Sequence, residues 1–450
     1  MNKDCYHFIG IGGIGMSGLA KILLEQGVSV HGSDLQSSAM VQQLIRQGAK
    51  ISLGHDKENI SLATKIVYST DIAETNPEYS AAVDAKVPVL HRSDLLWEIM
   101  SKYLPLLVTG THGKTTTSSL LTHVLCSVGK DPAFAVGGVV HSMQTNAKDG
   151  KGEYFVAEAD ESDGSFLKYH GHGAIITNID LDHLNYWKTE ETLIAGFFQF
   201  ASHIFSPHLF WCADDARLAA LHLPGVSYGY SPTADVRITS SRQEGWRLFF
   251  SLQWKESTYN DICIPLIGAH NVLNGAAVFA LCIQLGLEEQ KVREALRTFQ
   301  GVGRRAEKKG EMRGVAFYDD YGHHPTEIDT TLKAMKEAAG QSRLVAVFQP
   351  HRYTRTRDCL ATFPGCFSHA DVLILTDIYS AGEKPVEGVR GDVLFEEVKK
   401  QFSKEIHFLS REHLASFVGS FLQEGDVCIT IGAGDVTKIG PQVIEQWKTN

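Results

Sequence analysis

The stretch LPLLVTGTHGKTTTSSLLTHVLCSVG, residues 104–129, decides the fold of the middle of the chain. A short apolar run enters a glycine loop and a helix-like run leaves it, which predicts strand, loop and helix in that order. In such a loop, successive amides cradle phosphate oxygens, Lys114 offsets their charge, and the Thr115 hydroxyl can bind Mg²⁺. Only two residues separate Gly110 from Gly113, against four in the common GxxxxGK[ST] pattern. The setting between strand and helix nevertheless predicts an ATP-binding loop made of Gly110, Thr111, His112, Gly113, Lys114, Thr115 and Thr116.

A second glycine loop, GIGGIG at residues 10–15, lies between a strand-like run and an amphipathic run. Its glycines let the backbone approach a diphosphate, and the following helix start offers free amides. The pattern suits a dinucleotide-binding dehydrogenase, but it predicts only that a diphosphate binds, and a tight turn without a ligand is the other interpretation. The candidate substrate-binding residues here are Gly12, Gly13, Ile14, Gly15, Ser33 and Asp34.

The order of apolar runs predicts an α/β protein of three domains. Strand-like and helical runs alternate in the first hundred residues, which favours βαβ units and a Rossmann-like domain over residues 1–103. Residues 104–306 follow as a P-loop-type ATPase domain whose sheet is mixed, since RITSSRQEGWRLFFSLQW at 237–254 reads as a hairpin turning at Glu244-Gly245. Residues 307–450 form a smaller Rossmann-like α/β domain.

Composition excludes several classes of protein. The chain has 42 basic and 52 acidic residues, a formal charge of -10, and no stripe of lysines and arginines, so a nucleic-acid partner is not expected. No apolar run approaches the roughly eighteen residues of a membrane-spanning helix, so no membrane insertion is expected either. The eight cysteines form no CxxC pair and fit free thiols in a reducing compartment. We therefore expect a cytoplasmic protein.

Acidic residues follow the strand-like run YFVAEAD, in the sequence EADESD at residues 158–163. Carboxylates at the carboxyl end of a strand in the same sheet as a phosphate loop are well placed to hold Mg²⁺, which makes Glu158 a candidate ligand. A solvated acidic loop is the alternative. The sequence NIDLDH at residues 178–183 again follows a strand, so His183 would lie near the same edge, either as a ligand or as a structural histidine.

Three further groups of polar residues could contact ligands. Asn271 and Asn274 stand three apart and would share one face at a helix start; helix capping would explain Asn271 alone. The guanidinium group of arginine can donate two parallel hydrogen bonds to a carboxylate or a phosphate, although each arginine could equally make a surface ion pair. The remaining candidates come from GRR, DDYGHHPTE and QPHRYTR, and they are Arg305, Asp320, His324, Arg352 and Arg355.

Two phosphate loops in separate domains argue against a dehydrogenase, because hydride transfer has no use for a triphosphate-binding loop. Joining two molecules at the expense of ATP would use both loops. An NAD(P)-dependent oxidoreductase and a non-catalytic nucleotide-binding protein remain the alternatives.

In their sequence and order, eight motifs together resemble the Mur ligases of bacterial cell-wall synthesis; these are GIGGIGMSGLA, GTHGKTTT, EADESD, NIDLDH, HNVLN, GRR, DDYGHHPTE and QPHRYTR. The resemblance covers the whole chain. It implies a cytoplasmic ATP- and Mg²⁺-dependent ligase that adds L-alanine to the lactyl carboxylate of UDP-N-acetylmuramate in peptidoglycan precursor synthesis. ATP would first phosphorylate the carboxylate, and the amine would then displace phosphate.

The resemblance also implies individual roles. Lys114 and Thr115 would hold phosphates and one Mg²⁺, Glu158 would be a shared metal ligand, and His183 would serve a second Mg²⁺. The diphosphate of the sugar nucleotide would lie on the loop from Gly12 to Gly15. In the remaining motifs, Asn271 and Asn274 would contact adenine or its surroundings, Arg305 the γ-phosphate, and Asp320 the ribose. From side-chain chemistry alone, Arg352 and Arg355 could hold an acidic substrate, and His324 is a further candidate for substrate binding. Lys114, Glu158, His183 and Arg305 are thus the predicted catalytic residues.

Overall fold

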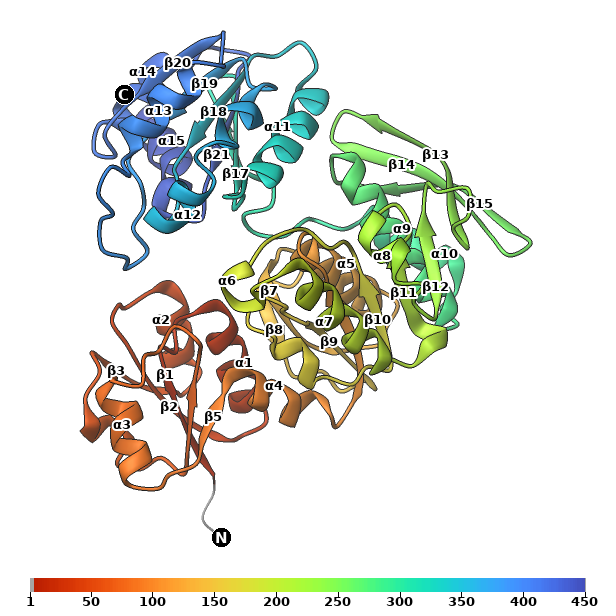
Figure 1. The fold of residues 1–450 in the computed structure, drawn as a ribbon, viewed down its shortest axis with the longest axis vertical. Helices are drawn as coiled ribbons and strands as arrows, with labels where there is room; N and C mark the ends of the chain where they lie inside the picture. Colours follow the sequence, from red (N-terminus) through yellow and green to blue (C-terminus); the bar gives the residue numbers. More distant parts are fainter. Residues whose placement is uncertain (1–3, 450) are drawn as a thin grey trace. The chain divides into compact units, whose positions relative to one another are not determined.

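The computed structural model describes residues 4–449, except for the side chains of residues 184 and 185 (Figure 1). Contacts divide the chain into two compact units. The first unit holds most residues up to Gln300. The second holds the residues from Gly301 onward together with Ser241–Phe249 and Pro265–Val272.

The first sheet has five strands in the order β3-β2-β1-β4-β5, all parallel. Helix α1 contacts α2 and α4, whereas α3 contacts η1. Strand order reverses between β1 and β4, and ligands of such sheets bind beyond the carboxyl ends of the strands at this reversal. The predicted Rossmann-like domain is confirmed. Its elements are β1 (Cys5–Ile9), α1 (Ile14–Glu25), β2 (Ser29–Asp34), α2 (Ala39–Arg46), β3 (Lys50–Leu53), η1 (Lys57–Ile60), β4 (Lys65–Tyr68), α3 (Pro77–Asp84), β5 (Val89–His91) and α4 (Arg92–Met100).

The second sheet has ten strands in the order β15-β14-β13-β12-β11-β10-β6-β9-β7-β8. Strands β6, β9, β10, β11 and β12 pair in parallel, while β7 and β8 pair antiparallel, so the predicted mixed sheet is confirmed. The strands are β6 (Leu104–Thr109), β7 (Ala133–Val140), β8 (Thr145–Lys148), β9 (Tyr154–Glu158), β10 (Gly173–Ile176), β11 (Leu209–Cys212), β12 (Val226–Gly229), β13 (Val236–Glu244), β14 (Arg247–Trp254) and β15 (Ser257–Ile264).

The helices that connect these strands are α5 (Lys114–Ser127), η2 (Ser165–Lys168), α6 (Leu184–Trp187), α7 (Glu190–Ser202), η3 (Ser206–His208), α8 (Ala216–Ala220), α9 (Ala269–Gln284) and α10 (Glu289–Arg297). The predicted hairpin is present between β13 and β14. Its turn is Gly245-Trp246, one residue later than predicted, because Gly245 has the positive φ of 57° that the tight turn requires.

The third sheet has six strands in the order β16-β17-β21-β18-β19-β20, parallel except for the β16–β17 pair. Alternate residues of β18 enter opposite clusters: Phe348 packs with α11 and α13, and Val347 packs with α14 and α15. Both faces are therefore buried, as parallel sheets require. The elements are β16 (Glu307–Met312), β17 (Val315–Asp320), α11 (Pro325–Ala339), β18 (Leu344–Phe348), α12 (Tyr353–Asp358), η4 (Phe363–Phe367), β19 (Val372–Leu375), α13 (Gly391–Lys399), β20 (Glu405–Phe408), α14 (Leu414–Phe421), β21 (Val427–Ile431), η5 (Asp435–Lys438) and α15 (Ile439–Thr449).

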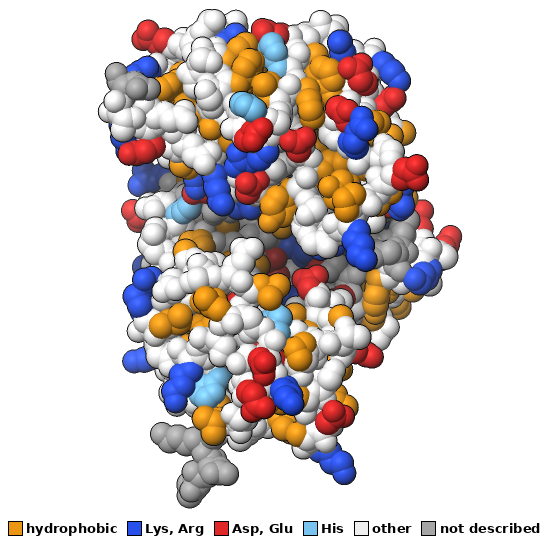
Figure 2. Space-filling model, turned by 90° about the vertical axis from the view of Figure 1, so that its left-hand side faces the viewer, with side chains coloured by type: hydrophobic (Ala, Val, Ile, Leu, Met, Phe, Trp, Pro, Cys, Tyr) orange, Lys and Arg blue, Asp and Glu red, His pale blue; other side chains and the backbone are white. Residues whose placement is uncertain are grey.

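The three sheets confirm the predicted α/β class, and the domain limits 1–103, 104–306 and 307–450 stay a prediction. No helix within the described part of the chain combines the length and apolarity that a membrane crossing needs. On the face seen in Figure 2, basic and acidic side chains are interspersed.

Candidate active site

The loop between β6 and α5 presents free amides at a helix start. Gly113, which precedes the helix, has φ of 85° and offers no side-chain cap, so the first amides of α5 have no acceptor within the helix. The amides of Thr111 and His112 instead donate to the backbone oxygen of Asn178 and to its side-chain oxygen, at 3.0 and 2.9 Å. The amides left for a phosphate are therefore those at the helix start, from Gly113 to Thr116.

The ammonium group of Lys114 is fully engaged. It donates to the carbonyl oxygens of Gly110 and Thr111, at 2.6 and 3.2 Å, and to Glu161 Oε2 at 2.6 Å. Burial raises the pKa of Glu161 to about 7 even though Lys114 opposes that shift, and Asp160 beside it raises the pKa further. An entering phosphate must replace at least one of the three acceptors of Lys114. Glu161 lies in the EADESD motif but is not among the site residues that the sequence predicts.

Glu158, at the end of β9, lies next to Thr115. The Thr115 hydroxyl donates to Glu158 Oε2 at 3.3 Å, while the Gly137 amide and the Ser118 hydroxyl donate to Oε1 at 2.6 and 3.1 Å. A Cβ added to Gly137 would lie 2.9 and 3.0 Å from the two carboxylate oxygens and 3.1 Å from Thr115 Oγ1. The missing side chain thus leaves space beside two hard oxygen donors, which is the donor chemistry that Mg²⁺ prefers. The residues present fit the predicted metal.

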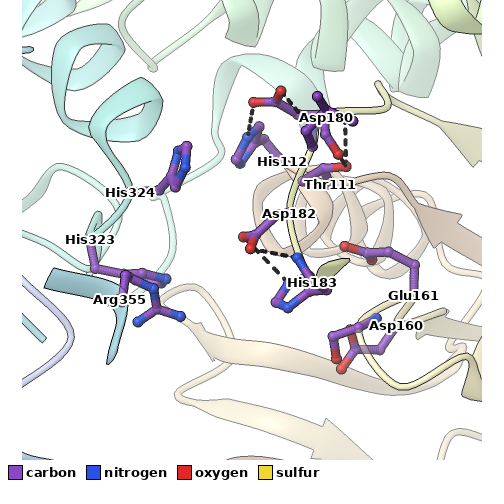
Figure 3. Close-up of polar contacts among 12 residues, drawn as sticks. Thr111, His112, Asp160, Glu161, Asp180, Asp182, His183, His323, His324 and Arg355 are labelled. Atoms are coloured by element: carbon purple, nitrogen blue, oxygen red, sulfur yellow. Dashed lines mark hydrogen bonds and ion pairs between the residues drawn. The ribbon is translucent and has the colours of Figure 1, made fainter. Parts of the chain in front are cut away.

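Two histidines near the loop each contact a carboxylate, as Figure 3 shows. His112 Nε2 donates to Asp180 Oδ2 at 3.0 Å, and the His183 amide donates to Asp182 Oδ1 at 2.7 Å. The His183 ring lies within 3.5 Å of the same Asp182 carboxylate, and His183 has a positive φ of 58°. The strained backbone fixes the place of this histidine at the start of α6. Its role as a ligand of a second Mg²⁺ stays a prediction.

The first glycine loop is held by Asp34. The Gly12 amide donates to Asp34 Oδ2 at 2.8 Å, and a Cβ at Gly12 would lie 2.9 Å from the same oxygen. Helix α1 then begins at Ile14, with Gly13 before it offering no side-chain cap. Gly13 and Ile14 are exposed, so the helix start faces solvent. This arrangement leaves the helix amides to an anion and occupies the carboxylate that would contact ribose in a dinucleotide-binding fold.

Ser33 differs from the other predicted substrate residues, because its side chain is fully buried. Its hydroxyl donates to Glu78 Oε2 at 2.6 Å, and Glu78 also accepts hydrogen bonds from His7 and Asn59, at 3.1 and 2.6 Å. Burial alone raises the pKa of Glu78, but the hydrogen bonds from these three side chains lower it overall. The Ser33 carbonyl accepts from the amides of Gly10 and of the residue after it. Ser33 therefore holds the glycine loop through its backbone carbonyl, while its buried side chain binds Glu78.

Asn271 and Asn274 lie in the first turns of α9. The helix begins at Ala269, so Asn271 is inside it and not at the capping position, and its side-chain amide donates to the carbonyl oxygen of Ile267 at 2.8 Å. A Cβ on Gly113 would lie 3.2 Å from the Asn274 side-chain oxygen. Asn274 therefore borders the phosphate loop. Contact of either asparagine with adenine stays a prediction.

The adjacent arginines Arg304 and Arg305 have different surroundings. Arg304 has a positive φ of 60° and donates to the carbonyl oxygens of Gly432 and Gly434, at 2.5 and 3.1 Å, and to Asp319 at 3.2 Å. The Arg305 guanidinium lies 4.0 Å from Glu327 and is one-third exposed. Arg304 ties the start of the second unit to its sheet, whereas contact of Arg305 with the γ-phosphate stays a prediction.

Asp320, at the end of β17, is buried and accepts from the amides of Ala306 and Gly322 at 2.8 and 2.7 Å. Burial raises the pKa of Asp320 to about 6, although the charge of Arg305 and both amides oppose the shift. His324 caps α11 and accepts from the amide of Thr326. The contact of Asp320 with ribose and the contact of His324 with substrate both stay predictions.

Arg352 immediately precedes α12, and Arg355 lies in its first turn, beside His351. Arg352 has a positive φ of 68°, and Arg355 Nη1 donates to His351 Nδ1 at 3.1 Å. Burial, together with the charge of Arg355, lowers the pKa of His351 to about 3, so this imidazole is a neutral acceptor at neutral pH. The His351 ring also stacks on Tyr379. These contacts orient the guanidinium of Arg355, and binding of an acidic substrate to it stays a prediction.

Three family models match the chain along its length. The Mur ligase family, catalytic domain, matches residues 5–104; the Mur ligase middle domain matches 108–282; and the Mur ligase, glutamate ligase domain, matches 304–434. The chain belongs to the Mur ligase family.

Relatives of this Mur ligase cover nearly all of it. It is 48% identical over 441 residues to the UDP-N-acetylmuramate–L-alanine ligase of Protochlamydia amoebophila (strain UWE25), covering 98% of this chain and 97% of the relative. A relative of the same name in Geotalea daltonii is 42% identical over 447 residues, covering 98% and 97%. Among solved structures, UDP-N-acetylmuramate-alanine ligase MurC of Thermotoga maritima is similar with a TM-score of 0.87 at 27% identity, covering 99% of both chains.

Sequence reasoning on this Mur ligase missed two contacts. One is the hydrogen bond that Lys114 donates to Glu161, and the other is the hydrogen bond that the Ser33 hydroxyl donates to the buried Glu78. Glu161 lies in a quoted motif, so a signal existed in the sequence. Nothing in the residues around Glu78 distinguishes it from an exposed helix-start glutamate.

Proposed function

We propose that this Mur ligase joins L-alanine to the lactyl carboxylate of UDP-N-acetylmuramate, with ATP hydrolysed to ADP and phosphate, in peptidoglycan precursor synthesis. The observation that supports ATP use best is the phosphate loop, in which Lys114 and the Thr115–Glu158 pair stand at an uncapped helix start. The names of the relatives that are 48% and 42% identical support the choice of substrates.

The chemistry follows from the fact that a carboxylate carries no good leaving group, because an attacking amine would have to expel oxide. A carboxylate does not accept an amine directly, so its oxygen first attacks the γ-phosphorus of ATP and gives an acyl phosphate and ADP. The neutral amine of L-alanine then attacks the acyl carbon, and phosphate leaves as the amide forms. L-Alanine is supplied with its amine protonated, so the amine must lose this proton before its lone pair can attack the acyl carbon.

Residues of the phosphate loop would position the triphosphate. The amides from Gly113 to Thr116 would bind phosphate oxygens, and Lys114 would exchange Glu161 or a carbonyl for a β- or γ-phosphate oxygen. Arg305 would meet the γ-phosphate. Such fixed positive groups stabilise the charge that gathers on the transferring oxygens.

Mg²⁺ would be held by the Thr115 hydroxyl and the Glu158 carboxylate, with His183 assigned to a second ion. When bound, Mg²⁺ neutralises phosphate charge and aligns the transferring group. The Gly137 amide and the Ser118 hydroxyl hold Glu158 in place for this role.

The remaining assignments complete the proposal. Gly12, Gly13, Ile14, Gly15 and Asp34 would form the diphosphate subsite of the sugar nucleotide. Asn271, Asn274 and Asp320 would surround the nucleoside of ATP, and His324, Arg352 and Arg355 would bind acidic groups of the substrates. We place the reaction in the cytoplasm, where ATP and nucleotide sugars are available.

Purified protein supplied with ATP, Mg²⁺, UDP-N-acetylmuramate and L-alanine should release phosphate and form a product heavier than the sugar nucleotide by one alanine residue. Glycine and L-serine in place of L-alanine test the choice of amino acid. Turnover of NAD(H) by the same preparation, without phosphate release, would support the oxidoreductase instead.

A further inference from the structure

Arg92 connects the glycine loop of the first sheet with the acidic segment of the second. It is the first residue of α4 and follows β5 directly. Its Nη2 donates to Asp160 Oδ2 at 3.0 Å and lies 3.7 Å from Asp163 Oδ2. These carboxylates belong to the segment that follows Glu158. One edge of the Arg92 guanidinium is therefore fixed by the segment that borders the ATP loop.

The other edge of this guanidinium faces the start of α1. A Cβ added to Gly15 would lie 3.4 Å from Arg92 Nη1, and Gly15 is the second residue of α1. Helix α1 also contacts α4. The loops that precede α1 and α4 both leave the carboxyl edge of the sheet, where β1 and β4 form the strand-order reversal. Nη1 thus lies beside the uncapped amides of the predicted diphosphate subsite.

The charges around Arg92 suit an anion-binding role in addition to the ion pair with Asp160. A diphosphate at the start of α1 would approach Asp160 and Asp163, and like charges at this range repel. A guanidinium between them compensates both sides, and its fork can bind a carboxylate on one edge and a phosphate on the other. About one-third of the Arg92 side chain is exposed, so a ligand can reach it.

We propose that Arg92 binds the diphosphate of the sugar nucleotide and that Asp160 orients it for this contact. The inference rests on the proposed function, since it takes UDP-N-acetylmuramate as the ligand of the glycine loop. The diphosphate subsite would then consist of the backbone amides of residues 12–15 and one charged side chain from α4.

A structural role for Arg92 is the rival explanation, and Lys168 provides the matched control. Lys168 Nζ donates to Asp94 Oδ1 at 2.5 Å and to Ser93 Oγ at 3.1 Å, so it joins the same helix α4 to the same stretch after β9. Lys168 contacts no residue of the glycine loop within the described structure. Arg92→Gln and Lys168→Ala therefore both remove a cation from this contact, but only Arg92→Gln removes one from the diphosphate subsite.

Binding of UDP-N-acetylmuramate, of UDP and of a non-hydrolysable ATP analogue with Mg²⁺ should be measured by calorimetry on the full chain. We expect Arg92→Gln to weaken UDP-N-acetylmuramate and UDP roughly 10- to 100-fold, the usual effect of losing a charge-assisted hydrogen bond. Binding of the ATP analogue should change by less than about threefold. Arg92→Lys, which keeps the charge, should recover part of the loss, and Lys168→Ala should bind all three ligands nearly as the wild type does.

Unchanged UDP-N-acetylmuramate binding by Arg92→Gln overturns the inference while leaving the proposed function in place. An equal loss of the sugar nucleotide and the ATP analogue, shared by Lys168→Ala, also overturns it, because that pattern belongs to a structural contact. A wild-type protein that binds neither UDP nor UDP-N-acetylmuramate removes the proposed function and the inference together.

Discussion

Gly137 provides a sharp test of the metal and phosphate site. Replacing Gly137 with alanine puts a methyl group 2.9 to 3.1 Å from both Glu158 carboxylate oxygens and from Thr115 Oγ1, closer than such contacts normally allow. Because Gly137 has no positive φ, the new residue fits the backbone and the strain falls on Glu158. The carboxylate must turn away from Thr115 and from the Gly137 amide that now donates to it at 2.6 Å.

The size of the effect follows from two contributions. An off-rotamer side chain costs about 0.5–1.5 kcal/mol, and loss of a hydrogen bond to a charged group costs about 1.5–3 kcal/mol. If the whole sum of about 2–4.5 kcal/mol bears on the metal site, it corresponds to a roughly 30- to 2000-fold lower kcat/KM for ATP. Phosphate release should be measured over a range of Mg²⁺ concentrations, and the half-saturating Mg²⁺ concentration should rise. The same costs act on the protein without ligand, so the free energy of unfolding should also fall, by at most the same amount.

Gly365→Ala is the matched control, since nothing lies within 4 Å of its added Cβ and its φ is not positive. This variant should keep wild-type kinetics. Activity of Gly137→Ala within about threefold of the wild type, with the same Mg²⁺ dependence, would refute the placement of the metal beside Glu158 and Thr115.

Further predictions concern Lys114, the arginine pair and one buried histidine. Lys114→Ala should abolish phosphate release while calorimetry still detects UDP-N-acetylmuramate binding; near-normal turnover would remove the loop from the mechanism. Arg304→Ala should lower the free energy of unfolding by about 2–4 kcal/mol, seen as a lower urea midpoint, because several buried acceptors lose their donor. Arg305→Ala should keep the midpoint and lose at least tenfold in kcat. The reverse pattern would contradict the roles given to these two arginines. Burial lowers the pKa of His323 to about 4, so only the unfolded chain gains this proton as pH falls from about 6.5 to 4, and stability is lost over that range. His323→Gln should remove up to about 3 kcal/mol of that loss, and identical pH dependence of unfolding in both proteins would contradict the burial of this imidazole.

The sequence predicted those parts of the molecule that depend on local chemistry. Glycine spacing, apolar periodicity and the residues at strand ends indicated both phosphate loops, the Rossmann-like first sheet and the mixed second sheet. Glu158 and Thr115 were predicted as metal ligands from separate motifs, and the order of strands β6 and β9 brings them together.

Contacts between distant residues could not be predicted in the same way. Glu161 and Lys114 are 47 residues apart, and His7 and Glu78 are 71 apart, so each pair exists only because particular strands are neighbours. Local sequence also could not tell Arg304 from its neighbour. A positive φ at Arg304, set by the packing of the second unit, decides which of the two side chains turns inward.

The most direct test of the central claim is the stoichiometry of phosphate release. With ATP, Mg²⁺, UDP-N-acetylmuramate and L-alanine all present, one ADP and one phosphate should appear for each amide product, and omission of either substrate to be joined should stop product formation. Phosphate release that continues without UDP-N-acetylmuramate and L-alanine, or complete absence of an amide product, would contradict the account.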